Sequence, residues 1–453
     1  MIMAFSTSIE SQSRAAVGQV LNLVLRDGEP VVVVDSPPGA GKTALVETLV
    51  ATAVLGFGLR VAVVTPRAEQ SNDLLRRLTR DYEPMTMQLL KAREREIPED
   101  ITILPELNIT SSADDLIEFN GPGVTIGTAA KMFLSVPQLG GEKFDILICD
   151  EAYQLAYKDF IPMFELANQI VLVGDPGQLL PLIQINTSLF EAASYRVHWP
   201  VPKETLRRFP SIPVVKLPAS RRLPQDTVEI IQPSFYPELP FSSIAGAERR
   251  IQVGANGCDD PIDKAIDLLS NGETIVGLLL PTADLLPVGI DEELTSLIAD
   301  ITQRLTTRNI QWSEQRTLEL RDIGCVDPHV ASGASIRRKL QQRGIPTDEV
   351  MVDTPEIWQG LERPIMIVKH PLSSQNRFDQ FNLEPGRFCV MLSRHQLGCI
   401  IVGRDGIGEA LERHQHDCGS RALGAENNEW IGWRAHSSIW AEMERRRRLI
   451  RIS

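Results

Sequence analysis

The segment SPPGAGKT at residues 36–43 constrains the fold of this chain more than any other feature. It follows the valine run 31–34 and precedes a helical pattern that begins at Lys42. A glycine-rich turn between a strand and a helix presents backbone N–H groups, an ammonium and a hydroxyl to a phosphate chain. Ser36 replaces the first glycine of GxxxxGK[ST], at a position that starts the loop and does not approach the phosphates most closely. The sequence predicts an ATP site in an α/β fold, with Mg²⁺ at Thr43. The expected nucleotide contacts are Pro38, Gly39, Ala40, Gly41, Lys42, Thr43 and Ala44.

A pair of carboxylates, Asp150 and Glu151, follows the apolar run 146–149 in the segment DEAYQ. An acidic residue at the carboxyl end of a strand can reach the metal of a phosphate-binding loop on the same sheet. We expect Asp150 to bind Mg²⁺ and Glu151 to orient and deprotonate the attacking water. Such a pair is by itself more often the N-cap of a helix, but its place after a phosphate-binding loop favours the metal site.

A third loop, GDPGQLLP at 174–181, follows the apolar run 170–173. A surface turn is one interpretation. The other is a loop whose Gln178 contacts the γ-phosphate and responds to its loss.

Short apolar runs alternate with helical patterns along both halves of the chain, which indicates βαβ units and parallel sheets buried on both faces. Proline-rich stretches near 199–218 and 233–240 suggest a domain junction. We therefore predict two tandem parallel-sheet domains with a cleft between them. The predicted boundaries are 1–215 for the first domain, 216–405 for the second and 406–453 for a polar, helical tail.

Composition excludes several classes of protein. The 453 residues are 43% hydrophobic and 23% charged, as in ordinary globular proteins, and the formal net charge of -13 argues against a protein that coats nucleic acid with bulk positive charge. The six cysteines form no CxxC pair, so we expect neither a disulfide framework nor a zinc ribbon, and a reduced cytoplasmic location. Apolar segments fall short of the roughly 18 residues that span a bilayer, so no membrane partner is expected.

Together, the three loops resemble motifs I, II and III of superfamily 1 helicases. The most similar branch includes the nonsense-decay RNA helicase, with the signatures GPPGTGKT, DEAxQ and GDxxQLPP. Upstream, Gln12 stands where this family has its Q motif, whose glutamine binds adenine. Thr65 and Pro66 resemble motif Ia, and Thr128 ends the next strand-end motif; both motifs contact the nucleic-acid backbone in relatives.

The second half continues the resemblance in the family's order, to about residue 405. Residues 219–224 resemble the QYRMxP segment, 356–362 resemble motif V with Glu362 as its acidic residue, and 387–394 resemble motif VI. The resemblance implies two RecA-like domains with ATP between them, Glu362 among the nucleotide contacts and Thr354 on the nucleic acid. It also implies arginine fingers on the γ-phosphate from Arg394 and from Arg221 or Arg222, of which we prefer Arg222 because Arg-Leu-Pro is the better register.

These features predict an ATPase that translocates on single-stranded DNA or RNA, 5′ to 3′ if it follows the family. Because Gln12 lies so near the first residue, we expect no β-barrel and stalk of the kind that precede the Q motif in many relatives. The alternative is therefore an ATP-driven switch or remodelling subunit whose partner supplies the accessory domain. A metabolite kinase is disfavoured because it leaves Gln154, Gln178 and the second half unexplained. The sequence does not distinguish a DNA track from an RNA track.

Three weaker signals favour ordinary interpretations. His414, His416 and Cys418 lack a fourth metal ligand, so a metal site is disfavoured. Trp358 is expected to pack in the core and not to stack on a base. The run Arg445–Arg448 follows two glutamates, which favours a solvated helix end over a phosphate-binding surface.

Overall fold

The chain divides into two compact units, each with its own parallel sheet. The computed structural model describes residues 2–118, 121–139, 144–181, 190, 193–246, 249–254, 259–283, 289–312, 316–373, 378–414 and 428–452, with no side chains described for 2–7, 117 and 118. Unit 1 contains Met1–Pro176 and Leu180–Ala219; unit 2 contains Gly177–Leu179, Ser220–Arg421 and Glu426–Ser453.

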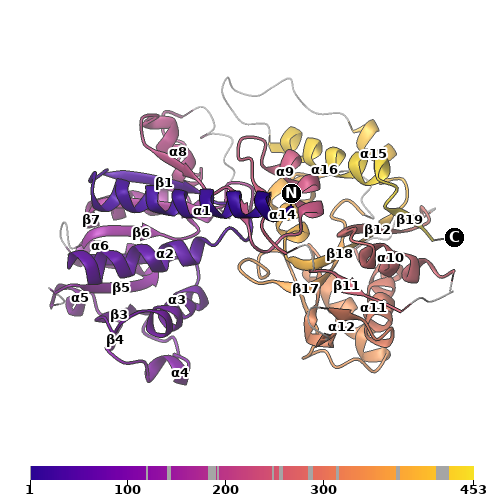
Figure 1. Cartoon of the computed structure of the whole chain (residues 1–453), viewed down its shortest axis with the longest axis horizontal. Helices are drawn as coiled ribbons and strands as arrows, with labels where there is room; N and C mark the ends of the chain where they lie inside the picture. The colour runs from indigo at the N-terminus through magenta and orange to yellow at the C-terminus, as the bar shows by residue number, and fades with distance from the viewer. Residues whose placement is uncertain are drawn as a thin grey trace. The chain divides into compact units, whose positions relative to one another are not determined.

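Unit 1 is built on an eight-stranded sheet in the order β4-β3-β5-β2-β6-β7-β1-β8, and every pair of neighbouring strands is parallel (Figure 1). The strands are β1 (Val31–Asp35), β2 (Arg60–Thr65), β3 (Met87–Leu90), β4 (Leu107–Thr110), β5 (Gly123–Thr128), β6 (Phe144–Cys149), β7 (Ala167–Gly174) and β8 (Val214–Lys216). The α-helices are α1 (Ile2–Leu25), α2 (Lys42–Ala51), α3 (Ala68–Asp81), α4 (Glu99–Thr102), α5 (Asp114–Glu118), α6 (Ala129–Leu139), α7 (Tyr157–Phe160) and α8 (Val201–Arg208).

The continuous apolar runs fold as strands because both faces of the sheet are covered. Successive side chains of a strand point to opposite faces. Val32 and Val34 pack in one core cluster with α1, α2 and α3, whereas Val33 packs in a second cluster with α6 and α7. A helix layer on each face explains why these strands carry no polar alternation.

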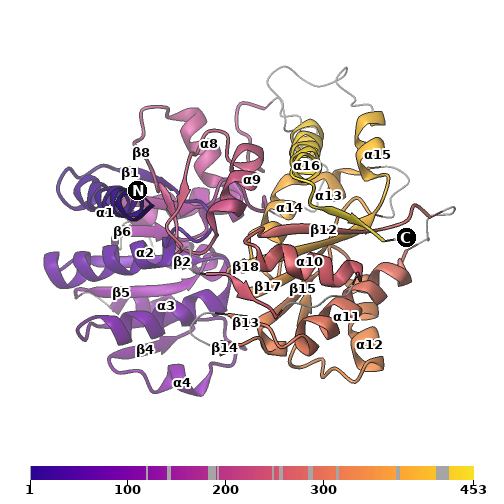
Figure 2. The same ribbon diagram turned by 45° about the vertical axis from the view of Figure 1, so that its right-hand side comes forward.

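Unit 2 is built on a six-stranded parallel sheet in the order β16-β15-β17-β18-β12-β19. Helices α10, α11 and α12 lie on one side of this sheet, and α14 and α16 on the other (Figure 2). Its strands are β12 (Ile275–Leu280), β15 (Ile323–Val326), β16 (Met351–Asp353), β17 (Arg363–Lys369), β18 (His395–Arg404) and β19 (Leu449–Arg451). The α-helices are α9 (Gln225–Phe235), α10 (Pro261–Ser270), α11 (Glu292–Thr307), α12 (Val330–Gln342), α13 (Gln380–Leu383), α14 (Pro385–Leu392), α15 (Ile407–Arg413) and α16 (Asn428–Arg445). Short strands β9 (Ala219–Ser220), β10 (Ser242–Ser243), β11 (Ile251–Gln252), β13 (Gln311–Trp312) and β14 (Arg316–Thr317) form two smaller sheets.

The prediction of a separate polar tail at 406–453 is wrong. Strand β19 pairs with β12 and completes the second sheet, and α16 buries Ile439 and Met443 in the core of unit 2. A three-residue strand among arginines gives almost no sequence signal, so the tail was indistinguishable from a solvated segment. Among the described residues, no helix combines the length and apolarity needed to cross a membrane.

Candidate nucleotide site

The phosphate-binding loop connects the end of β1 to the start of α2, as the sequence predicts. Gly39 and Gly41 have φ values of 72° and 89°, in the left-handed region that favours glycine. The Ser36 N–H donates to the carbonyl oxygen of Gly174 at 2.9 Å, and the Ser36 side chain is buried. The loop is therefore tied at its first residue to the end of the neighbouring strand β7.

The carboxylate pair lies within reach of this loop. The Lys42 Nζ is 3.3 Å from Glu151 Oε1, and the two side chains are only 13% and 11% exposed. Glu151 has a φ of 56°, a strained conformation for a residue with a side chain. Burial and the negative charge of Glu151 raise the pKa of Asp150 to about 7, although the positive charge of Lys42 opposes this shift.

These residues fit a divalent cation. Two buried carboxylates share a single ammonium, so a further positive charge would relieve their repulsion. Oxygen donors such as the Asp150 carboxylate and the Thr43 hydroxyl are the ligands that Mg²⁺ prefers. Asp150 directly follows β6, and Thr43 lies in the first turn of α2, which begins after the loop at the end of β1.

Tyr153 and Asp35 support the acidic loop, a role that the motif pattern did not reveal. The Tyr153 hydroxyl donates to Asp35 Oδ1 at 2.6 Å. A Cβ at Gly174 would lie 2.9 Å from the Tyr153 ring, so only glycine allows this close approach. In the sequence, this contact is indicated only by Asp35, an acidic residue that ends a strand after four valines. Within the described structure the Gln154 Nε2 is buried without a hydrogen-bond partner.

Arg222, Glu362 and Arg394 come together in unit 2. The Arg222 guanidinium pairs with the Glu362 carboxylate and donates to the Ser393 carbonyl oxygen at 3.3 Å. Burial opposes ionisation of Glu362, but the charges of Arg222 and Arg394 and a hydrogen bond from Gln396 outweigh it and lower the Glu362 pKa. The Arg394 side chain is 1% exposed and its Nε donates to Val390 O at 3.3 Å, whereas Arg221 is exposed.

The other predicted contacts lie elsewhere. Gln12 is exposed on α1. Gln178 belongs to the short segment 177–179 of unit 2, and its carbonyl oxygen lies so close to Gly386 that a Cβ there would clash with it. Thr354 follows β16 at the carboxyl ends of the second sheet, the edge opposite to Glu362 and Arg394, which precede β17 and β18. These positions show that the predicted residues of unit 2 do not form a single cluster.

The predicted nucleic-acid contacts of unit 1 differ in exposure. Pro66 and Thr128 are half-buried and follow or end neighbouring strands. The Thr65 side chain is fully buried, where its hydroxyl donates to Arg67 O at 2.8 Å and lies 2.7 Å from Ser71 Oγ. The Thr65 hydroxyl thus stabilises the turn into α3.

Two of the weaker signals are settled by burial. Trp358 is fully buried and its indole N–H donates to Cys325 O at 3.2 Å, which confirms the packing interpretation. The expectation of a solvated helix end at Arg445–Arg448 holds for Arg445 and is wrong for Arg446 and Arg448, which pair with acidic residues of unit 2.

The weak metal signal falls partly outside the described chain. His414 Nε2 lies 3.1 Å from Glu429 Oε1, while His416 and Cys418 lie outside the described residues. Within the described ranges no three His, Cys, Asp or Glu residues form a metal-binding group.

A phosphate-binding loop and a buried carboxylate pair at the carboxyl edge of a parallel sheet are typical of a P-loop NTPase, here in a chain with a second parallel-sheet unit. Two family models, each described as an AAA domain, match residues 14–189 and 291–406. Together with two curated relatives, these matches support a superfamily 1 helicase of the branch that includes the regulators of nonsense transcripts.

Two curated relatives illustrate this. The regulator of nonsense transcripts 1 homolog of Neurospora crassa is 23% identical over 438 residues, covering 86% of this chain and 36% of that protein. The DNA replication ATP-dependent helicase/nuclease JHS1 of Arabidopsis thaliana is 24% identical over 379 residues, covering 81% of this chain and 26% of that protein. The chain therefore spans about a third or less of the length of these relatives.

Among solved structures, the PRRSV helicase matches at 15% identity with a TM-score of 0.40, covering 91% of this chain and 57% of that chain. An arterivirus nonstructural protein 10 helicase in complex with DNA matches at 13% identity with a TM-score of 0.40, covering 83% and 61%.

Proposed function

We propose that this protein hydrolyses ATP with Mg²⁺ in order to move along single-stranded nucleic acid, 5′ to 3′. The observation that carries the proposal is the pairing of Lys42 with Glu151 at 3.3 Å, beside the buried Asp150. This arrangement supports a site in which Lys42 binds phosphate, Glu151 is the general base and Asp150 is a metal ligand.

In the proposed reaction, the Lys42 ammonium leaves its ion pair with Glu151 and binds the phosphates of ATP. The Glu151 carboxylate then accepts a proton from the attacking water. Mg²⁺, held by Asp150 and Thr43, would neutralise charge on the phosphate oxygens. Arg222 and Arg394 would stabilise the γ-phosphate in the transition state. Glu362 holds Arg222 in the free protein and would share it with the nucleotide.

Local positive charge supports a nucleic-acid track on unit 1. Lys91 and Arg93 follow β3, and Lys131 lies in the first turn of α6 after β5. Because β3, β5 and β2 are neighbours in a parallel sheet, these residues share one edge with Pro66 and Thr128. Backbone contacts of this kind need few cations, so the net charge of -13 is compatible with a strand that is bound and released.

The test is ATP turnover with saturating single-stranded DNA, single-stranded RNA and duplex. We expect at least one single strand to raise turnover, with K42A as the inactive control. Turnover that stays at its basal rate with both single strands would overturn translocation.

An alternative proposal is a nucleic-acid-stimulated ATPase switch within a larger complex, with a protein partner that supplies an accessory domain. Between α3 and β5 the described residues form only the short elements β3, α4, β4 and α5, which favours a compact core. Strand displacement on a tailed duplex distinguishes the two: unwinding by the isolated chain supports the motor.

The four described cysteines are buried thiols, in keeping with the proposed cytoplasmic location.

A further inference from the structure

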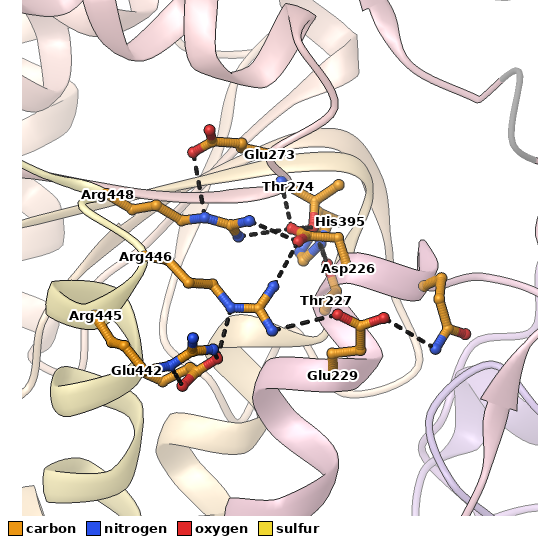
Figure 3. Close-up of polar contacts among 11 residues, drawn as sticks. Asp226, Thr227, Glu229, Glu273, Thr274, His395, Glu442, Arg445, Arg446 and Arg448 are labelled. Carbon is orange, nitrogen blue, oxygen red and sulfur yellow. Dashed lines mark hydrogen bonds and ion pairs between the residues drawn. The ribbon is translucent and has the colours of Figure 1, made fainter.

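Two arginines near the end of the described chain close on the first turn of α9. Arg448 Nη2 lies 2.6 Å from Asp226 Oδ1, and its Nη1 donates to Asp226 Oδ2 at 2.7 Å. Arg446 Nη1 lies 2.9 Å from the same carboxylate, and Arg448 Nε lies 3.2 Å from Glu273 Oε2 (Figure 3). We call Asp226, Glu273, Arg446 and Arg448 the arginine clamp.

The arginine clamp continues into a chain of buried hydrogen bonds. The backbone N–H and the hydroxyl of Thr274 donate to Asp226 Oδ2 at 2.9 Å and 2.8 Å. The Thr227 hydroxyl lies 2.6 Å from the Thr274 hydroxyl and 2.7 Å from His395 Nε2 (Figure 3). His395 directly follows Arg394, so the chain of contacts ends beside a proposed arginine finger.

These groups lie at the edge of the second sheet where its strands begin, which we call the amino edge. Strands β17, β18, β12 and β19 are neighbours in that order, and they begin directly after Glu362, Arg394, Thr274 and Arg448. Helix α9 begins three residues after Arg222. The first turn of α9 is therefore fixed by the arginine clamp, while Arg222, three residues before the helix, binds Glu362 and the Ser393 carbonyl.

The ion pairs of the arginine clamp are better suited to orienting the segments that they join than to stabilising the fold. The Arg448 side chain is 7% exposed and that of Asp226 is 20% exposed. Taking such charges out of water costs free energy that their attraction only partly returns, so apolar residues would join the same elements at least as firmly. A bidentate guanidinium–carboxylate pair instead fixes direction.

We propose that the arginine clamp is a positioning device that holds α9 and the start of β18 so that Arg222 and Arg394 face the γ-phosphate together. This inference rests on the proposed function of those two arginines. The segment after α16 thereby contributes to ATP hydrolysis without touching the nucleotide.

The test compares R448M with R404M. Arg404 is also 7% exposed and pairs with Asp291 at 2.8 Å, but it ends β18 at the opposite edge of the same sheet. We expect R448M to lower kcat for ATP by roughly tenfold or more, with the KM for ATP and the Kd for ADP within about twofold of the parent values. R404M should lower thermal stability with kcat within about twofold. R448K, which keeps one charge, should recover part of the loss and serves if R448M does not fold.

The single variants R222A and R394A and the double variant R222A/R448M separate this proposal from the one on which it rests. If R222A alone and R394A alone leave kcat unchanged, the proposed arginine roles fail, and the positioning proposal fails with them. If both lower kcat but R448M behaves like R404M, only the positioning proposal is overturned. In an R222A background, R448M should cost less than it does in the parent chain, because part of its effect acts through Arg222; a fully multiplicative loss contradicts the proposal.

Discussion

The two sheets carry their proposed catalytic groups at opposite edges. In unit 1, the phosphate-binding loop, Asp150 and Glu151 all follow strands, at the edge where parallel strands end. In unit 2, Glu362 and Arg394 precede strands, at the amino edge. The same kind of sheet is therefore used in two different ways.

The two units hold their proposed catalytic groups in position in different ways. Loops at the carboxyl edge of unit 1 lead into helix N-termini, so backbone N–H groups and left-handed glycines provide the geometry. At the amino edge of unit 2, the Arg222 guanidinium is fixed instead by a carboxylate and a carbonyl oxygen of distant segments. Unit 1 thus depends on local backbone conformation, and unit 2 on long-range ion pairs.

The largest expected effect is at the carboxyl edge of unit 1. Both K42A and E151Q should lower ATP turnover by about 10⁴-fold or more, because one removes the phosphate-binding ammonium and the other the general base. E151Q should still bind ATP, measured with a fluorescent analogue at equilibrium. A Glu151 variant with full turnover would remove the general base from this site.

The amino edge of unit 2 should respond next. We expect R394A to lower kcat by about 10³-fold with little change in the Kd for ADP, since a γ-phosphate contact is absent from the diphosphate. R221A is the matched control, because the Arg221 side chain is exposed, and its kcat should remain within about twofold of the parent value. Equal losses in the two variants would contradict the assignment.

Acid should destabilise unit 2 more than unit 1. Burial lowers the pKa of His370 to about 3, and burial with the charge of Arg222 lowers the pKa of His395 to about 3. Burial and the neighbouring His370 lower the pKa of His436 well below its ordinary value. Below pH 6.5 the unfolded chain binds protons that the folded unit does not, so the contribution of these histidines to the free energy of unfolding is full above pH 6.5. It falls by about 1.4 kcal/mol per histidine for each pH unit below that, down to about pH 3 for His370 and His395. In unit 1 burial raises the pKa of Asp35, which acts in the opposite direction.

Tryptophan fluorescence can resolve this difference. Trp199 lies in unit 1 and the other five tryptophans lie in unit 2, so a urea titration followed by fluorescence reports chiefly on unit 2. Its midpoint should move to lower urea between pH 7 and pH 5. An unchanged midpoint would show that these histidines do not stay neutral in the folded state.

The contrast between the edges also explains what the sequence could predict. The phosphate-binding loop and DEAYQ are contiguous, and each follows an apolar strand, so their residue types and spacing carry the chemistry. The pairing of Lys42 with Glu151 follows from two strands of one parallel sheet ending at the same edge. Even in unit 1, however, the support of Tyr153 by Asp35 joins residues 118 positions apart and leaves no local pattern.

The amino edge of unit 2 could not be assembled from spacing. Arg222 meets Glu362 across 140 positions, and Arg448 meets Asp226 across 222. Each arginine alone looks like a solvated surface charge, and the run Arg445–Arg448 looked most like one. Only the register of β19 beside β12 brings Arg448 to the first turn of α9.

The smallest expected effect distinguishes two threonines at the carboxyl edge of unit 1. T65A should lower the free energy of unfolding by about 1 kcal/mol, because it removes a buried hydroxyl bonded to Arg67 O and near Ser71 Oγ, and should leave the Kd for single-stranded nucleic acid within about twofold. T128A should weaken that Kd by about threefold, since Thr128 is half-exposed beside the basic residues after β3 and β5. T65S keeps the hydroxyl and should retain the stability of the parent chain. Denaturant titrations and fluorescence anisotropy with a labelled oligonucleotide measure the two quantities. If T65A weakens binding as much as T128A does, then both threonines contact the strand, and this edge of the sheet binds nucleic acid through more than its exposed residues.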